Sequence, residues 1–120
     1  MKIAIIGSRN LSPLTILVVA IEIYETIEDV NVTEVISGGA RGIDSIAEKA
    51  AKVLNKTMTI IRPNNPSKKQ DYILRNFKIV DQADKIIAYW NGKSKGTLST
   101  INYAKRINKE IVIREIPLKK

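Results

Sequence analysis

The sequence contains neither cysteine nor histidine. Without cysteine it can form no disulfide, thiolate zinc site or iron–sulfur cluster, and without histidine its remaining metal ligands are oxygen atoms. Catalysis that depends on a cysteine nucleophile or a histidine base is excluded as well. Such oxygen ligands suit magnesium or calcium at most. We predict no metal site and no bound cofactor.

Long hydrophobic runs are also missing. The apolar run at 16–21 is broken by Glu22, so it falls well short of the ~20 residues that a membrane span requires. The run at 3–6 is too short for a signal-peptide core. We expect a cytoplasmic protein with no membrane segment. The length of 120 residues, 44% of them hydrophobic, favours one domain over 1–120.

Charge is abundant and unevenly spread. The chain has 20 basic and 12 acidic residues and a net charge of +8. Residues 1–50 carry four basic and seven acidic side chains, whereas residues 51–120 carry sixteen basic and five acidic. This asymmetry fits an anionic partner, nucleic acid or nucleotide, that faces the C-terminal half, and it fits equally a protein kept soluble by lysine.

Apolar runs alternate with helical patterns along the whole chain. Short β-branched runs predict strands, and apolar residues at helical spacing predict helices between them. The helix expected at 13–29 is apolar on most of its surface, which predicts either deep burial or a place in a subunit interface. The expected strands lie at 2–6, 34–37, 57–61, 85–89 and 110–116, and the expected helices lie at 13–29, 42–54, 71–82 and 97–108.

Strict alternation of strands and helices predicts an α/β fold, with a parallel sheet and helices on both of its faces. In open sheets of this kind, ligands bind beyond the carboxyl ends of the strands. We therefore expect function in the strand-to-helix loops at 7–12, 38–42, 62–70 and 90–96.

The loop after the second expected strand is the strongest signal. Its glycines let the backbone turn sharply, and the start of the following helix adds partial positive charge, so the loop favours a phosphate site over a simple tight turn. Arg41 can add a bidentate clamp, and Asp44 falls in the first helical turn, where it also complements the helix dipole. The stretch reads Ser37, Gly38, Gly39, Ala40, Arg41, Gly42, Ile43, Asp44.

The loop at 90–96 leads into a helix start at Lys95-Gly96-Thr97. We expect Thr97 to cap this helix and the exposed amides beside it to hold a second phosphate. The loop lacks the Gly-Lys-Ser/Thr order of a Walker P-loop. Trp90 is the only tryptophan, and the sequence leaves open whether it stacks on a base or packs against the fold.

The loop after the first strand begins Gly7-Ser8-Arg9. It lacks the Gly-x-Gly-x-x-Gly pattern, so a nicotinamide or flavin dinucleotide is disfavoured. Arg9 follows a strand end and can reach the same crevice, and Arg75-Asn76 follows a lysine pair near the start of another helix. Together with Lys93 and Lys95, these groups are expected to supply positive charge.

These loops, in this order, resemble the SLOG superfamily and, within it, the DprA-like (Smf) branch of DNA-processing proteins. The resemblance implies a Rossmann-like three-layer α/β/α sandwich with a five-stranded parallel sheet in the order 3-2-1-4-5. It also implies that the loops hold the phosphates of a nucleotide or nucleic acid. It is carried by Gly7-Ser8-Arg9, by 37–44, by Arg75-Asn76, by Ala83-Asp84 and by Lys95-Gly96-Thr97.

Members of the DprA-like branch bind single-stranded DNA as dimers. The resemblance therefore implies a homodimer, for which the helix at 13–29 offers a face, and single-stranded nucleic acid or a nucleotide as the partner. In the related LOG phosphoribohydrolases a glutamate acts where this sequence has Thr100. We therefore predict a binding domain without catalytic residues.

Two alternatives stay open. One is an N-glycosidase or phosphoribohydrolase-like enzyme in which Asp44 or Asp84 replaces the missing glutamate. We expect Asp84 at the amino end of a strand, away from the crevice, which leaves Asp44. The other alternative is a dimeric module that senses a regulatory nucleotide.

Overall fold

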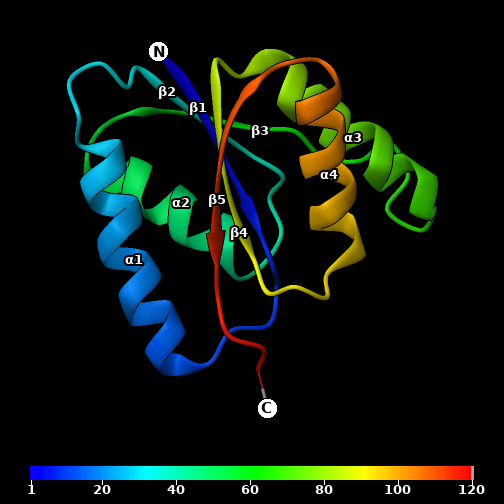
Figure 1. The fold of residues 1–120 in the computed structure, drawn as a ribbon. Helices are drawn as coiled ribbons and strands as arrows, with labels where there is room; N and C mark the ends of the chain where they lie inside the picture. Colours follow the sequence, from blue (N-terminus) through cyan, green and yellow to red (C-terminus); the bar gives the residue numbers. More distant parts are fainter. Residues whose placement is uncertain (120) are drawn as a thin grey trace.

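The chain forms an open sheet of five parallel strands with two helices on each face (Figure 1). The computed structural model describes residues 1–119. The strand order is β3-β2-β1-β4-β5, so the predicted Rossmann-like α/β fold and its strand order are confirmed. The strands are β1 (Lys2–Gly7), β2 (Glu34–Ser37), β3 (Thr57–Ile60), β4 (Lys85–Trp90) and β5 (Glu110–Glu115), and the helices are α1 (Pro13–Ile27), α2 (Ile43–Val53), α3 (Lys69–Gln82) and α4 (Lys95–Arg106).

Strand β1 lies at the centre of the sheet, and its side chains divide between two cores. Ile3 and Ile5 pack with buried residues of α1 and α2, whereas Ala4 and Ile6 pack with buried residues of α3 and α4. Helices cover both faces of the sheet, so neither face of a central strand meets solvent. The central strands therefore carry apolar residues at consecutive positions instead of alternating polar and apolar ones.

The boundaries of the elements agree with the prediction to within about two residues, but the start of α4 changes one assignment. The side chain of Ser94 accepts a hydrogen bond from the Thr97 amide at 3.3 Å, so Ser94 is the N-cap and α4 begins at Lys95. The expected cap at Thr97 is therefore wrong. The Ser94 hydroxyl pairs the Thr97 amide, which has no partner within the helix. Thr97 is therefore the third residue of the helix and not its cap.

Helix α1 buries one side only. Its buried residues are Thr15, Val19, Ile23 and Ile27, which excludes the deep burial that the apolar composition allowed. The opposite side is apolar as well and is exposed to solvent, at Leu14, Leu17, Val18 and Ile21. Within residues 1–119, no helix combines the length and the apolar character needed to cross a membrane.

Candidate functional site

Two adjoining hollows lie at the carboxyl ends of the strands, where the strand-to-helix loops meet. The first hollow has a volume of about 460 Å³ and the second about 430 Å³. Arg9, Ala40 and Arg75 line both, so these three residues form the wall between them. We refer to the two hollows together as the crevice.

The structure brings most of the predicted site residues into this crevice. The second hollow is lined by Gly38, Gly39 and Arg41, in addition to the shared wall. Ser37, Gly42, Trp90 and Lys95 line neither hollow. The predicted residues that line the first hollow are Gly7, Ser8, Arg9, Ala40, Asp44, Arg75, Asn76, Gly96 and Thr97.

The Ser8 hydroxyl is the one buried side-chain polar atom of residues 1–119 without a hydrogen-bond partner. Ser8 is 3% exposed and lines the first hollow. Leaving a buried polar group unpaired costs roughly 1–3 kcal/mol, so native folds rarely tolerate it without a reason. Ser8 thus places one unused hydroxyl donor beside this hollow.

The start of α4 supplies further donors to the first hollow. The side chain of Asn91 accepts from the Ser94 amide at 2.9 Å, and the Ser94 hydroxyl accepts from the Thr97 amide. The amide of Gly96, which lines this hollow and which an α-helix cannot pair internally, remains directed beyond the helix end. This helix N-terminus carries partial positive charge, as an anion site requires.

The glycines of the second loop allow neighbouring loops to pack closely. Gly42 has a φ of +77°, and a Cβ placed there would lie 2.6 Å from the carbonyl oxygen of Arg9. A Cβ on Gly38 would lie 2.6 Å from Nη1 of Arg75. The glycines are therefore required by the loop after β1 and by Arg75, and not only by an incoming ligand.

Arg75 is a positioning residue for these loops. Its guanidinium donates to the carbonyl oxygens of Gly38 and Ile61, the second at 3.2 Å, and to the Asn76 side chain at 2.8 Å. Arg75 is 6% exposed, and this burial lowers the pKa of its guanidinium from the usual value, which the negative charge of Asp44 opposes. Arg75 thus connects the segments that follow β2 and β3, besides contributing charge to the crevice.

Asp44 is a buried carboxyl group in the first hollow. Its Oδ2 atom accepts a hydrogen bond from the Ala40 amide at 3.1 Å. Burial raises the pKa of Asp44 to about 6, although the Ala40 amide and the charge of Arg75 act in the opposite direction. Asp84 lies at the amino ends of the strands, away from the crevice, as the sequence predicted. There it accepts a hydrogen bond from the Lys2 amide at 2.7 Å.

Sequence reasoning missed Arg62 and Tyr72, which line the second hollow. The guanidinium carbons of Arg9 and Arg75 lie 5.4 Å and 5.3 Å from the centroid of the Tyr72 ring. Such distances are typical of cation–π contacts. The spacing of Tyr72 and Arg75, three residues apart on one helix, places them on the same face and would have indicated the contact.

Trp90 stabilises the loop before α4. Its indole N–H donates to the carbonyl oxygen of Ser94 at 3.0 Å, and its ring packs against the core under α3 and α4. Of the two interpretations that the sequence left open, packing is the one this arrangement supports.

The N-terminal half of the chain carries a family signature. Residues 1–62 match the family model of DNA recombination-mediator protein A, a span that includes Gly7-Ser8-Arg9 and the glycine loop at 37–44. The chain belongs to this DNA recombination-mediator protein A family. The resemblance to the DprA-like DNA-processing proteins is thereby confirmed.

Solved structures with this fold include DNA processing protein A from Helicobacter pylori, which is described by its single-stranded DNA binding mode. It is 19% identical with a TM-score of 0.78, and the match covers 100% of this chain and 67% of that protein. DNA processing protein A from Streptococcus pneumoniae is 20% identical with a TM-score of 0.79, over 93% of this chain and 49% of that protein.

The same fold occurs in a molybdenum cofactor binding protein from Rippkaea orientalis. It is 21% identical with a TM-score of 0.73, over 93% of this chain and 74% of that protein. No curated protein matches the sequence. This member of the DNA recombination-mediator protein A family thus shares its fold with proteins named for different ligands, so the fold alone does not identify the ligand.

Proposed function

We propose that this chain binds single-stranded nucleic acid along the crevice, with a backbone phosphate in the first hollow and the adjoining nucleotide in the second. The observation that carries the proposal is the unpaired Ser8 hydroxyl, a buried donor in a hollow that also receives the N-terminus of α4. These donors suit an oxygen-rich anion.

The charges around the crevice support an anionic ligand as well. Arg9 and Lys93 line the first hollow, and Arg41 and Arg62 line the second. Asp44 is the only carboxylate among the lining residues of either hollow in the described chain, and its raised pKa weakens its charge near pH 6. Phosphate therefore meets an excess of positive charge.

The connection between the hollows favours a strand over a single nucleotide. A mononucleotide carries its phosphate into one hollow, whereas a strand continues past Arg9 into the other. A base can stack on the Tyr72 ring, which lines the second hollow. Removal of such a ring weakens binding by roughly 1–3 kcal/mol. The single-stranded DNA binding described for the Helicobacter pylori protein agrees with this proposal.

The test is a titration of Trp90 fluorescence with a short oligothymidylate at two salt concentrations. Trp90 is the only tryptophan and contacts the start of α4, so ligand in the first hollow alters its surroundings. We expect saturable binding that weakens as salt increases. Arg9→Ala should weaken binding strongly, whereas the matched control Lys52→Ala, in the last turn of α2, should leave it unchanged.

Two outcomes would contradict the proposal. If Arg9→Ala binds the oligonucleotide as tightly as the parent chain, the crevice is not the site. If thymidine monophosphate saturates the fluorescence change with little effect of salt, the ligand is a free nucleotide and the sensing module is the better description.

The hydrolytic alternative now rests on Asp44 alone, because Asp84 lies at the opposite edge of the sheet. A carboxyl group with a pKa of about 6 in the first hollow is suited to donate a proton to a leaving base. Incubation with nucleoside monophosphates, followed by chromatography for free base, tests it. Release of base that is abolished in Asp44→Asn would favour the enzyme.

We also propose that the chain forms a homodimer, as the resemblance implies, for which the exposed apolar side of α1 offers a face.

A further inference from the structure

The outward side of α4 carries basic and hydrogen-bonding side chains. The helix contains no aspartate or glutamate, and its buried residues are Thr97, Thr100, Ile101 and Ala104. At about 3.6 residues per turn, four other residues fall in one line opposite this buried side. We call them the α4 stripe: Lys95, Ser99, Asn102 and Arg106.

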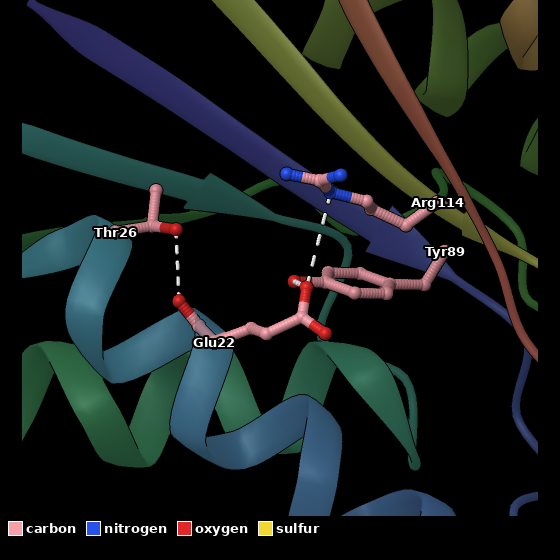
Figure 2. Close-up of polar contacts among 4 residues, drawn as sticks. All are labelled: Glu22, Thr26, Tyr89 and Arg114. Carbon is pink, nitrogen blue, oxygen red and sulfur yellow. Dashed lines mark hydrogen bonds and ion pairs between the residues drawn. The ribbon is translucent and has the colours of Figure 1, made fainter.

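The basic groups of the α4 stripe are exposed and have no acidic partner. Among residues 1–119, neither Lys95 nor Arg106 forms an ion pair. The other face of the sheet differs, because there Nε of Arg114 lies 3.8 Å from the Glu22 carboxylate of α1 (Figure 2). The positive charge of the stripe is therefore available to an anion from solution.

The position of Lys95 opposes the dipole of its own helix. Lys95 is the first residue of α4, and the first turn contains no acidic residue. A helix N-terminus carries partial positive charge, so a lysine there is unfavourable for the helix, whereas Lys105 and Arg106 in the last turn are favourable. An anion bound beside Lys95 accounts for this charge, and the stability of α4 does not.

The two faces of the sheet also differ in the charge of their helices. Helices α1 and α2 cover one face and together contain four acidic and two basic residues. Helices α3 and α4 cover the other face and together contain two acidic and six basic residues. A polyanion that leaves the crevice is thus attracted to the face of α3 and α4.

The α4 stripe begins where the crevice ends. The second hollow lies over the ends of β2 and β3, and the first lies over the ends of β1 and β4. Ser94 and Gly96 line the first hollow, whereas Lys95 between them lines neither. A strand that crosses the two hollows in this order reaches the start of α4 next, and α4 runs away from the crevice (Figure 1).

We propose that the α4 stripe binds further phosphates of the same single strand, which runs along α4 from Lys95 toward Arg106. This proposal rests on the proposed function. The two basic residues are eleven positions apart, or about 16 Å along the helix axis, a length that several nucleotides span. Ser99 and Asn102 lie between them and can donate hydrogen bonds to phosphate oxygens. The stripe has no apolar residue, which a lipid surface would require.

The test compares labelled oligothymidylates of about four and about twelve nucleotides by fluorescence anisotropy. The shorter one occupies the crevice alone, and the longer one also reaches the stripe. We expect the logarithm of the binding constant to fall more steeply with the logarithm of salt for the longer one, by about 1.4 for two more phosphates. Between roughly 50 mM and 200 mM salt, the longer one then loses about sevenfold more affinity.

The double variant Lys95→Gln/Arg106→Gln should remove this difference between the two lengths. It should change binding of the shorter oligonucleotide by less than about twofold, because salt screens exposed charges that lie outside the crevice. The matched control is Lys49→Gln/Lys52→Gln, which removes the same charge from exposed positions of α2 and should preserve the difference.

The single variant Lys95→Glu separates binding from the stability of the helix. A glutamate at the first position of α4 complements the helix dipole, so the melting temperature measured by circular dichroism should not fall. The steeper salt dependence of the longer oligonucleotide should nevertheless decrease.

Three results would overturn the proposal. The double variant could keep the steeper salt dependence, which would direct the strand away from α4. The control could lose it to the same extent, which would make the effect one of total charge. The parent chain could bind both lengths with equal salt dependence, which would exclude the α4 stripe and leave the proposed function intact. Only failure to bind either length would reject both.

Discussion

Two residues of the first hollow, Ser8 and Asp44, are poorly satisfied by the protein that surrounds them. The Ser8 hydroxyl has no hydrogen-bond partner among residues 1–119, and the Asp44 carboxylate is buried, with the Ala40 and Gly38 amides and the Arg75 guanidinium nearby. Both features favour a bound oxygen anion, because the anion would accept a hydrogen bond from Ser8 and would favour the neutral form of Asp44. The ligand would thus relieve costs that the free protein carries.

Removing the Ser8 hydroxyl separates these costs. We expect Ser8→Ala to weaken oligothymidylate binding about fivefold, since one hydrogen bond to the ligand is worth roughly 1 kcal/mol. The free energy of unfolding of the free protein should not fall, because the hydroxyl makes no bond there. Fluorescence titration and urea denaturation of the same variant measure the two effects. A loss of stability without a loss of affinity would contradict the role of Ser8 as a ligand donor.

Oligonucleotide binding should depend on pH through Asp44. Above its pKa of about 6 the carboxylate repels a phosphate, and below it the neutral acid does not, so affinity should rise as the pH falls through 6. A further pKa rise of one unit on binding corresponds to about tenfold in affinity.

The chain has no histidine, so no side chain with an ordinary pKa competes in this range. Anisotropy at pH 5 and pH 8, with an oligonucleotide lacking a terminal phosphate, measures the change. Asp44→Asn is the control and should bind equally at both pH values.

The free energy of unfolding should also depend on pH through Asp44. The pKa of Asp44 rises from 3.8 to about 6 on folding, so its contribution to the free energy of unfolding is full below pH 4 and is lost as the pH rises through 6. The loss is about 3 kcal/mol at most for a shift of this size. Urea denaturation at pH 4.5 and 7.5 should show that Asp44→Asn gains stability relative to the parent chain at the higher pH. An equal difference at both pH values would contradict the assignment.

At the scale of helices and strands, the sequence predicted the sheet and the loops that form the crevice. Alternating apolar runs and helical spacings suffice for this because each strand is covered on both faces. The prediction was weaker wherever a contact joins two loops. Nothing local indicates that Arg75 would turn its guanidinium to the Gly38 carbonyl, because these two residues, 37 positions apart, meet only after the sheet has formed.

Two glycines near the crevice differ in whether they tolerate a side chain. Gly42 has a positive φ, and an added Cβ would collide with the Arg9 carbonyl oxygen, so Gly42→Ala should lower the free energy of unfolding by about 2 kcal/mol or more. Gly96 lies in the first turn of α4, where a Cβ meets no atom within 4 Å, so Gly96→Ala should be neutral or stabilising by up to about 1 kcal/mol. Thermal denaturation of both variants decides, and equal melting temperatures would contradict the comparison.

At the scale of the molecule, the positive charge of the crevice comes from both halves of the sequence and not from the basic C-terminal half alone. We expected the anionic partner to face the basic C-terminal half, but the crevice draws Arg9 and Arg41 from the first half and Arg62 and Arg75 from the second. The fold brings these distant arginines together because Arg9, Arg41 and Arg62 follow the carboxyl ends of strands, and α3 places Arg75 beside them. Whether the chain forms one domain stays a prediction.

The salt dependence of binding reports how many of these charges meet phosphates. For a single strand the logarithm of the binding constant falls with the logarithm of salt concentration by about 0.7 per phosphate neutralised. Arg62→Ala should reduce this slope by about that amount and weaken binding of all short oligonucleotides alike, whereas Lys52→Ala should leave the slope unchanged. An unaltered slope in Arg62→Ala would exclude the second hollow from the path of the strand.

The central place of β1 also has a consequence for the synthesis of this protein on the ribosome. Strand β1 pairs with β2 on one side and with β4 on the other, where Ile3 meets Lys85. At about 5–20 residues per second, the ribosome takes several seconds to add β4 after β1. Through this interval the apolar stretch at 3–6 has one edge without its partner strand, a state that invites misassociation. Nascent chains should therefore depend on chaperones more than the small size of the finished protein suggests.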